Sequence, residues 1–579
     1  MGQTSCCGLE KGIPRRAMLS FKIVILTDSD LPATCESIEA ILRVSGISIV
    51  AIVFDRDPPT ARKKWASFKR NIRREGYGYL YYKIFVSIRD FLDARAQAIV
   101  PALEVERTLA DSFPQRSFSL RSLSERTGIP TREVDDLNGP EAVELIRGLG
   151  ADLGVVLGAR TLKRSTFSVP RMGCISLHKG KVPEYRGTPP GFWELYDGIP
   201  QAGVTVHFVD DGLNTGDVLE EDQVEIDRCE HPRTLRSKLD VLGTDLLRRV
   251  MEDLTQGRAA RRQQTDQGSK ARTCPTRAER RRLHEKLGIP DPTESWKYAY
   301  KTLLYLAFYY GGIWHLVRAM RRLLDRPRAS ILLYHRVNDD CYDPLTISPR
   351  RFAEHMMLVR KHYRAISTED LLQALKSERL PPDCVLIHFD DCYADVYTNA
   401  ARILKTAGFP ACSFVSSAFV DTHRRFQHDI DRCPVRLANF TTEELRALRK
   451  CGFTIGSHTI NHVDMGKCGG EAYEELTGSK RQLQTILDEP VTLFSYPFGG
   501  RENVTPEVLE LAQRAGYEAV FSAYGGRVTN KTSPFDIPRF GVSEDFRCLD
   551  LLMELEGLSL RCLKERVFPQ RARWKPSFS

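Results

Sequence analysis

Several common features are absent from this chain of 579 residues, and each absence narrows what the protein can be. Its fifteen cysteines show no CxxC motif and no paired spacing, which argues against a disulfide-stabilised framework. No early segment combines a basic stretch, an apolar stretch and a cleavage site, so we expect no signal peptide. Together these absences predict a reducing, cytoplasmic setting.

A strong charge imbalance is also missing. The formal net charge is +9, a mild excess for this length, and much of it falls in one short segment. A nucleic-acid-binding surface needs basic residues along a folded face, so we expect no nucleic-acid partner. The chain is too long for one hydrophobic core, which predicts two or more domains.

The first part of the chain reads as alternating strands and helices. Residues 1–20 are predicted to be a disordered leader, followed by strands at 21–30 and 48–55. Residues 141–158 repeat the pattern as an amphipathic helix, a glycine turn and an apolar strand. A long amphipathic helix at 234–257 closes the domain. Such units build a doubly wound parallel sheet that binds ligands at the carboxyl ends of its strands.

Between the two halves lie a basic segment and an apolar segment. Residues 257–286 are basic, polar and nearly free of large apolar side chains, which predicts a solvated linker; contact with RNA or anionic lipid is the weaker alternative. Residues 302–317 are strongly apolar, have basic flanks and are short for a membrane span. We expect either a helix packed between domains or an interfacial helix in peripheral contact with a membrane.

A second series of strands begins at residue 329, and several of these strands end in polar residues. In an α/β barrel such strand ends converge on one face, where the site lies. The expected strands are 329–337, 384–390, 411–417, 453–458, 492–498 and 518–523.

Two of these strand ends carry residues suited to metal chemistry. Asp390 and Asp391 follow one strand, and His458 and His462 follow another, four residues apart. Two histidines at this spacing project the same way if the segment is helical, and one carboxylate completes a three-ligand set that leaves a place for water. The other carboxylate can then accept the proton of that water. The two acids serve one site only if the strand has ended and the chain turns there.

These residues resemble the polysaccharide deacetylase family over about residues 329–545. "HFDDCYAD" is similar to the family's TFDDGYxD motif, "SHTINH" to its H(S/T)xxH motif, and "SYPFGG" to its third motif in the variant that lacks arginine. The resemblance implies a distorted (β/α) barrel with Asp390 as general base. It implies Asp391, His458 and His462 as ligands of a divalent metal, most commonly zinc. The implied reaction is hydrolysis of an N-acetyl group from a sugar.

The chain departs from this family at two places. Cys392 stands where the motif has glycine, so the turn after the acids must avoid a positive φ or tolerate it. The family often takes its general acid from a late histidine, yet no histidine follows His462. His335, at the end of the first strand, is the proposed substitute; the alternative is a histidine bonded to nearby backbone.

The first half resembles formyltransferases that use 10-formyltetrahydrofolate, over about residues 21–257. The markers are "PEYRG", "GVTVHFVD" and "GLNTGDVL", in that order. The resemblance implies a site of Asn-x-His plus a later Asp, in which histidine handles the proton of the amine. This chain keeps His178 but has Ser176 in place of the asparagine and Asn214 in place of the aspartate. The loss of one oxyanion donor costs about 2.7–4 kcal/mol.

Two interpretations of the first half therefore remain, a working formyltransferase and a binding or scaffold domain. The predicted architecture is α/β throughout, with a Rossmann-like domain at 21–257, a basic linker and apolar helix at 258–325, and a (β/α) barrel at 326–579. The combined hypothesis is that the barrel deacetylates a nucleotide-linked or lipid-linked amino sugar and the first domain formylates the exposed amine. The alternative is a deacetylase with a silent first domain.

Overall fold

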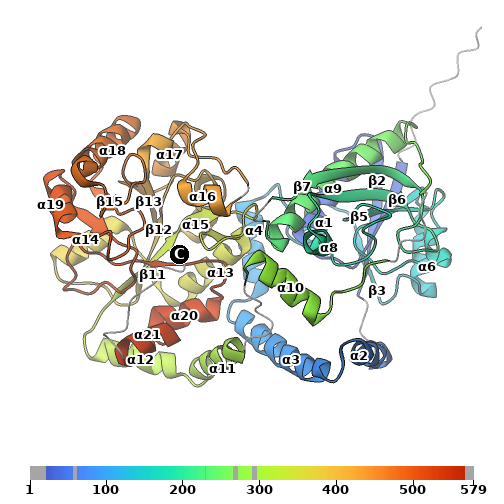
Figure 1. Ribbon diagram of the computed structural model, residues 1–579, viewed down its shortest axis with the longest axis horizontal. Helices are drawn as coiled ribbons and strands as arrows, with labels where there is room; N and C mark the ends of the chain where they lie inside the picture. Colours follow the sequence, from blue (N-terminus) through green and yellow to red (C-terminus); the bar gives the residue numbers. More distant parts are fainter. Residues whose placement is uncertain are drawn as a thin grey trace, which may run out of the picture. The chain divides into compact units, whose positions relative to one another are not determined.

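The computed structural model describes residues 21–56, 61–227, 230–264, 271–289, 296–433 and 435–567. The predicted leader, residues 1–20, lies outside these described residues. Packing divides the chain into two compact units, whose elements are labelled in Figure 1. The first unit comprises Met1–Ala61, Ser117–Ile226 and Lys238–Cys274, and the second comprises Arg62–Arg116, Asp227–Ser237 and Pro275–Ser579.

The first unit is built on a seven-stranded sheet in the order β3-β2-β1-β4-β5-β6-β7. The pairs from β3 to β5 are parallel, and β6 and β7 are added antiparallel. Strand order reverses at β1 and β4, which is where doubly wound sheets bind their ligands. The strands are β1 (Phe21–Thr27), β2 (Ile47–Asp55), β3 (Thr131–Val134), β4 (Leu153–Val156), β5 (Cys174–His178), β6 (Gln201–Phe208) and β7 (Val218–Glu225).

Helices pack against this sheet because each has an apolar face along one side. The α6 helix (Pro140–Leu149) begins with a proline in its first turn and ends at Gly150, whose φ of 57° suits glycine. Its buried face packs on β1, β2 and β4 in a common apolar cluster. The other helices are α1 (Pro32–Leu42), α5 (Leu120–Thr127), α7 (Arg164–Phe167), α8 (Phe192–Asp197) and α9 (Pro232–Thr255).

The second unit contains an eight-stranded sheet in the order β16-β15-β14-β13-β12-β8-β17, with β11 paired to β12. Its pairs are parallel, so the carboxyl ends of the strands lie at one edge, as in a (β/α) barrel that is not closed between β16 and β17. The strands are β8 (Ala329–Tyr334), β11 (Arg364–Ala365), β12 (Cys384–Phe389), β13 (Ala411–Val415), β14 (Phe453–Ser457), β15 (Leu493–Ser495), β16 (Ala519–Phe521) and β17 (Phe540–Gly541). A small separate ladder pairs β9 (Arg336–Val337) with β10 (Thr346–Ile347).

Helices between these strands complete the second unit. Capping boxes start α14 at Ser367 and α17 at Thr441, where each side chain accepts a hydrogen bond from the backbone three residues on. The helices are α13 (Pro349–His362), α14 (Thr368–Lys376), α15 (Ala401–Ala407), α16 (Gln427–Arg432), α17 (Thr442–Lys450), α18 (Ala472–Leu487), α19 (Pro506–Arg514), α20 (Cys548–Glu556) and α21 (Leu560–Val567). The predicted fold class is thus confirmed in both halves.

Packing differs from the predicted domain boundaries in the segment between β2 and β3. This segment forms α2 (Ala61–Glu75), α3 (Gly78–Gln97) and α4 (Ala102–Ser112), which group with the barrel rather than with the first sheet. On α4, Thr108 donates a hydrogen bond to Met357 of α13, and Ser112 donates to Thr406 of α15. Contacts between residues so far apart leave no local sequence pattern, so the predicted first domain, residues 21–257, included this segment.

The basic segment after residue 257 is not simply a solvated linker. Gln264 is buried in the first unit, and its amide donates hydrogen bonds to the backbone oxygens of Asn214 and Gly216. Further along, α10 (Arg277–Leu287) is a helix with a capping box at Thr276. The prediction of a solvated linker is therefore wrong at Gln264, whose side chain binds backbone oxygens instead of water, and α10 is an ordered helix within that segment.

The apolar segment 302–317 is not one helix. Gly312, with a φ of 72°, separates α11 (Trp296–Tyr310) from α12 (Ile313–Leu323). Both helices belong to the second unit. Among the described residues, no helix is long and apolar enough to cross a bilayer.

Candidate functional site

The two acids at the end of β12 sit where the strand stops. All six residues of β12 are buried, and the strand ends at Phe389. Asp390 still donates its backbone N–H to the Tyr334 oxygen at 3.1 Å, but Asp391 has a φ of 76°. This left-handed conformation turns the chain, so the two carboxylates do not alternate across the sheet. The expected turn is present, and Asp391 rather than Cys392 carries the positive φ.

Asp391, His458 and His462 come together at this turn. One potential ligand atom from each residue lies within 4.8 Å of the others. The Nε2 atom of His462 is 3.2 Å from Asp391 Oδ1, and that of His458 is 3.6 Å from the same oxygen. The spacing of the two histidines suits a helix, but the segment from His458 to His462 is not helical. Instead, φ values of 66° at Thr459 and 57° at His462 fold the loop back on itself.

The tautomer of His458 is set by the neighbouring strand. Its Nδ1–H donates to the backbone oxygen of Ser495 at 2.8 Å, so Nε2 keeps its lone pair on the side of Asp391. Burial lowers the pKa of His458 to about 4, which keeps the ring neutral. A neutral imidazole with a free Nε2 lone pair is the form that binds metals.

Asp391 shows that this cluster fits a cation. Both of its carboxylate oxygens are buried, and neither accepts a hydrogen bond from any described residue. A buried carboxylate without donors is costly unless another positive group satisfies it. Two imidazoles and one carboxylate are donors that Zn²⁺ accepts, and three protein ligands leave a position for water. The residues present therefore fit a divalent metal.

Asp390 is held differently, by a buried arginine. Arg539, just before β17, donates two hydrogen bonds to its carboxylate, both at 2.7 Å. Arg539 also donates to the hydroxyl of Ser495, which stands in the motif that lacks arginine. Burial raises the pKa of Asp390, but the charge and hydrogen bonds of Arg539, with smaller contributions from His458 and His335, lower it below its usual value on balance. Asp390 is therefore ionised, as a general base must be.

His335 lies near both acids. Burial lowers the pKa of His335, and the charges of Asp391 and Asp390 oppose that shift. The structure thus brings His335 to the predicted site. Cys392 lies behind the site: its side chain is fully buried, burial raises the pKa of its thiol, and it is not among the residues that could hold the metal.

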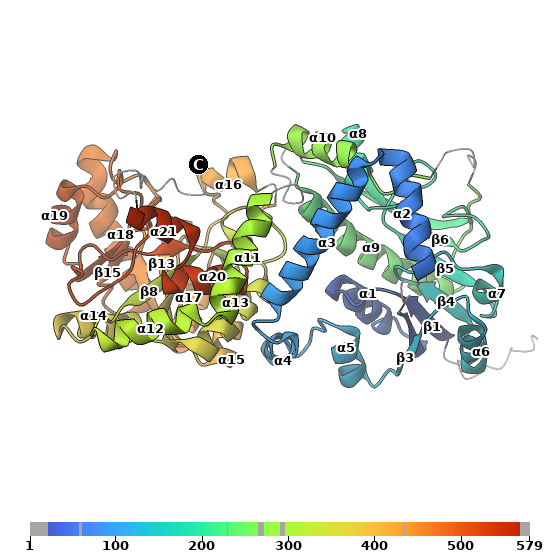
Figure 2. The same cartoon turned by 90° about the horizontal axis from the view of Figure 1, so that it is seen from below.

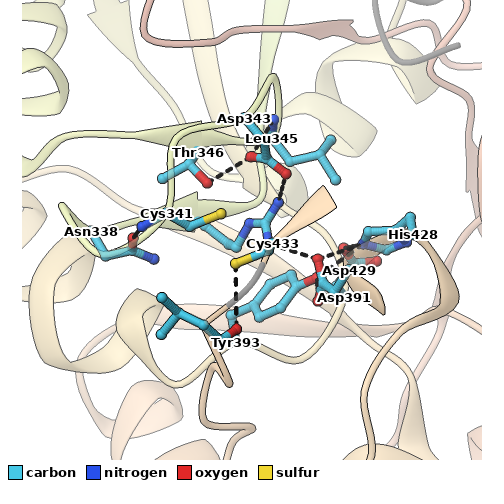
Figure 3. Close-up of polar contacts among 12 residues, drawn as sticks. Asn338, Cys341, Asp343, Leu345, Thr346, Asp391, Tyr393, His428, Asp429 and Cys433 are labelled. Atoms are coloured by element: carbon cyan, nitrogen blue, oxygen red, sulfur yellow. Dashed lines mark hydrogen bonds and ion pairs between the residues drawn. The ribbon is translucent and has the colours of Figure 1, made fainter. Parts of the chain in front are cut away.

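His428, on α16, is a member of the site that the sequence motifs do not indicate (Figure 3). Tyr393 donates its hydroxyl to Asp429 at 2.7 Å, so its oxygen accepts the Nε2–H of His428 at 2.9 Å. The same Nε2 atom is 3.6 Å from Asp391 Oδ2. Because this nitrogen carries a proton, His428 is not a metal ligand in this arrangement. It faces Oδ2 and leaves Oδ1 of Asp391 to the other two histidines.

Only one sequence signal could have indicated His428. The pair His428–Asp429 follows β13, and loops after barrel strands line the site. Asp429 in turn accepts a 2.6 Å hydrogen bond from the fully buried Arg336. This chain of contacts joins residues from three separate parts of the barrel, so it is visible only in the fold.

The first unit has its own cluster at the ends of β5 and β6. Ser176 and His178 lie two apart on β5 and share a face of the sheet. His178 donates Nε2–H to the Tyr185 oxygen at 2.9 Å, and its Nδ1 accepts from the Asn214 amide at 3.2 Å. Burial lowers the pKa of His178 to about 4, so the ring is neutral. Both ring nitrogens are therefore already bonded within the protein.

This histidine is held in a tightly packed loop. A side chain at Gly180 would come within 2.5 Å of the Tyr185 oxygen and 2.7 Å of His178 Nε2, so only glycine fits there. Asn214 adopts a φ of 55°. The Gln264 contacts described above hold the Asn214 backbone, so the segment after α9 supports this site.

Comparisons with known proteins match both halves of the chain. A family model described as formyl transferase matches residues 102–251, and one described as polysaccharide deacetylase matches residues 377–520. The two predicted resemblances are thus confirmed, in the predicted order along the chain. The second unit contains a polysaccharide deacetylase domain, which supports carbohydrate deacetylase activity.

The curated relatives match the first half. Methionyl-tRNA formyltransferase of Geotalea uraniireducens is 36% identical over 156 residues, which is 27% of this chain and 49% of that protein. The enzyme of the same name from Geotalea daltonii is 31% identical over 189 residues, 32% of this chain and 59% of that protein. The chain thus spans about half of the length of these relatives. Among solved structures, the Streptococcus pyogenes deacetylase PplD in complex with acetate is 22% identical, with a TM-score of 0.34, and the match covers 40% of this chain and 99% of that one.

Proposed function

We propose that the second unit removes the N-acetyl group of an amino sugar in a metal-dependent hydrolysis. The observation that carries this proposal is the cluster of Asp391, His458 and His462 beside an ionised Asp390. The unsatisfied oxygens of Asp391 and the tautomer of His458 support metal binding. The match to a polysaccharide deacetylase model supports the substrate class.

The residues divide the chemical work. A bound divalent cation supplies a Lewis acid that makes water more acidic and polarises the amide carbonyl. Asp390 accepts the proton of the attacking water, and Arg539 keeps that carboxylate ionised and oriented. His335 is the proposed acid that gives a proton to the nitrogen as the C–N bond breaks. Acetate and a free amine are the products.

The histidine of the first unit is already hydrogen-bonded at both ring nitrogens. In the Asn-x-His plus Asp arrangement, the acid accepts a hydrogen bond from one ring N–H, which leaves the lone pair of the other ring nitrogen for the amine. Here Asn214 donates to Nδ1 and Tyr185 accepts from Nε2, so no lone pair of His178 faces a substrate. This favours the alternative in which the formyltransferase-like unit is catalytically impaired and binds ligand. Formyl transfer from 10-formyltetrahydrofolate to the exposed amine is the second candidate, supported by the family match.

The proposed substrate is a nucleotide-linked or lipid-linked amino sugar of a surface-polysaccharide or glycolipid precursor. The test incubates the full chain and an N-acetylated nucleotide sugar with Zn²⁺, with and without 10-formyltetrahydrofolate. Acetate release with a free amine supports deacetylation alone, and a formylated product supports the exchange of acetyl for formyl. Absence of turnover on both nucleotide-linked and lipid-linked sugars favours a scaffold.

Variants locate the activity. His458→Gln should abolish acetate release, whereas His423→Gln, at an exposed histidine of the same unit, should leave it unchanged. Full activity of His458→Gln, or of the wild-type chain after complete metal removal, would contradict the proposal.

A further inference from the structure

Three helices of the second unit cover one side of α20. The α20 helix is buried along its whole length, and α3, α11 and α12 each contact it. In Figure 2, which looks from below, these three helices lie in front, and Figure 1 shows α11 and α12 below α20 and α21 with α3 beside α11. In the sequence, α3 precedes strands β3 to β7 of the first unit, whereas α11 and α12 follow them.

Each of these helices turns one face toward α20 and the other toward solvent. Phe85 and Leu92 of α3, Tyr305 of α11 and Trp314 of α12 are buried. The residues on the opposite faces are exposed. Figure 1 draws the three helices on the lower side of the second unit, and Figure 2, seen from below, draws them in front, so their exposed residues lie on one side of the unit. We call this surface the α3–α11–α12 face.

The α3–α11–α12 face is unusually apolar for a solvent-exposed surface. On α12, Leu316, Met320 and Leu323 recur every three or four residues and form a stripe, with Leu316 61% exposed and Leu323 84% exposed. Exposed Tyr81 and Ile88 lie on α3. Contiguous exposed apolar residues of this kind mark a surface that meets a partner.

Basic residues outnumber acidic ones around this face, although α3 carries Asp90 and Asp93. Neither α11 nor α12 contains an acidic residue. Lys297 and Lys301 lie on α11, and the end of α12 carries Arg318, Arg321 and Arg322. Arg326 and Arg328 follow, and four of these arginines line a shallow cleft of about 140 Å³ with Asp383.

Two carboxylates offset part of this positive charge. Asp383 pairs with Arg318 at 3.1 Å and with Arg322 at 2.6 Å, and Glu556 is 3.5 Å from Arg328. Asp325 is the other acid in the cleft. Five arginines thus face three acids, and Arg326 is exposed at the rim. The end of α12 therefore remains cationic.

We propose that the α3–α11–α12 face docks on the surface of an anionic phospholipid bilayer. Apolar side chains flanked by Lys and Arg are the pattern of interfacial helices, which bury their apolar face at the headgroup boundary. Tyrosines such as Tyr81, Tyr300 and Tyr310, all exposed on this face, suit the same boundary. The cationic end of α12 complements anionic headgroups. Membrane attachment is then peripheral, because no described helix could span the bilayer.

The experiment floats the full chain with vesicles of equimolar phosphatidylcholine and phosphatidylglycerol, and with vesicles of phosphatidylcholine alone. We expect the protein to float with the anionic vesicles and to bind the neutral ones at least about tenfold less. Raising the salt concentration should weaken binding to the anionic vesicles. Failure to float with anionic vesicles at low salt would overturn the proposal.

Substitutions then assign the binding to this face. The double change Leu316→Glu and Leu323→Glu should lower anionic-vesicle binding by about tenfold or more, since it removes two exposed apolar side chains and adds two negative charges. The matched control is Val241→Glu, at a residue 65% exposed on α9 of the first unit, which should bind like the wild type. Circular dichroism checks that the variants fold.

The competing occupants give distinct results. If a second copy of the chain covers the face, the wild type sediments as a dimer, the double variant sediments as a monomer, and neither floats with vesicles. If the double variant floats as well as the wild type, another surface binds the membrane. Either outcome would refute the docking face.

Discussion

The buried ion pair between Asp390 and Arg539 offers the sharpest test of the deacetylase site. Arg539→Met keeps an apolar side chain of similar length but removes the guanidinium. Its side chain is fully buried and that of Asp390 is 4% exposed, so solvent cannot replace the two 2.7 Å hydrogen bonds. Removing one partner of such a pair costs about 3–5 kcal/mol in the free energy of unfolding.

The pH dependence of that loss follows from the carboxylate left behind. Without Arg539, the largest opposing influence is lost, and burial, the largest cause acting on Asp390, should raise its pKa above the usual value. A group whose pKa is raised on folding destabilises the folded state at high pH, and the effect disappears below its unfolded pKa. The difference in stability between variant and wild type should therefore be largest at neutral pH and should shrink toward pH 4. The acid limb of deacetylase activity should move to higher pH, because the base must be ionised.

Urea unfolding measured by circular dichroism across the acidic range, together with the pH profile of acetate release, checks this reasoning. The matched control is Arg449→Met, which breaks the partly exposed pair with Glu489 and should cost less than about 1 kcal/mol. Arg539→Lys keeps the charge and should retain the pH profile better than the methionine variant. Unchanged stability at neutral pH and an unmoved acid limb in Arg539→Met would refute a role for Arg539 in ionising Asp390.

Three further outcomes are expected. His428→Ala should weaken Zn²⁺ binding about tenfold or more, measured by competition with a chromophoric chelator, because the imidazole that faces the second oxygen of Asp391 at 3.6 Å is lost; His428→Gln keeps a polar side chain there and should bind nearly as well as the wild type, and equal affinity of all three proteins would count against this role. Asn214→Asp should raise tetrahydrofolate release in the formyl-transfer assay by about tenfold or more, since a carboxylate reverses the tautomer of His178 and frees Nε2; a rate at or below the wild-type value would show that the tautomer is not what limits transfer. Because the pKa of His178 falls from 6.5 to about 4 on folding, the folded state loses about 3 kcal/mol as pH drops from 6.5 to 4; His178→Gln should flatten this part of the urea-midpoint profile, and an equally steep profile in the variant would assign the dependence to other groups.

Many strands of both sheets could be predicted from the sequence because their signal is local, whereas the short strands β3, β11 and β17 were not predicted. Runs such as 384–390 are apolar and continuous, as strands buried on both faces must be. The helix at 234–257 shows a regular apolar face and was expected to within a few residues. The same reasoning failed at 302–317, where Gly311 and Gly312 end one helix and begin another.

The packing of the segment between β2 and β3 had no such local signal. The sequence of α3 and α4 is helical in either unit, and only contacts made far along the chain decide which unit it joins. Thr108 on α4 meets Met357, which lies 249 residues later. The role of Gln264 was likewise hidden, since a polar residue in a basic segment is usually solvated.

The sequence alone determined the two family resemblances, the fold class and the grouping of Asp390, Asp391, His458 and His462 at strand ends. Parallel strands bring their carboxyl ends to one edge of the sheet, so residues at those ends lie near one another whatever the conformation of the loops. Only the tertiary structure decided that Arg539 holds Asp390 and that His428 approaches Asp391. These partners come from segments whose sequence has no fixed spacing to the motifs, and a contact across 149 residues depends on how the barrel curls.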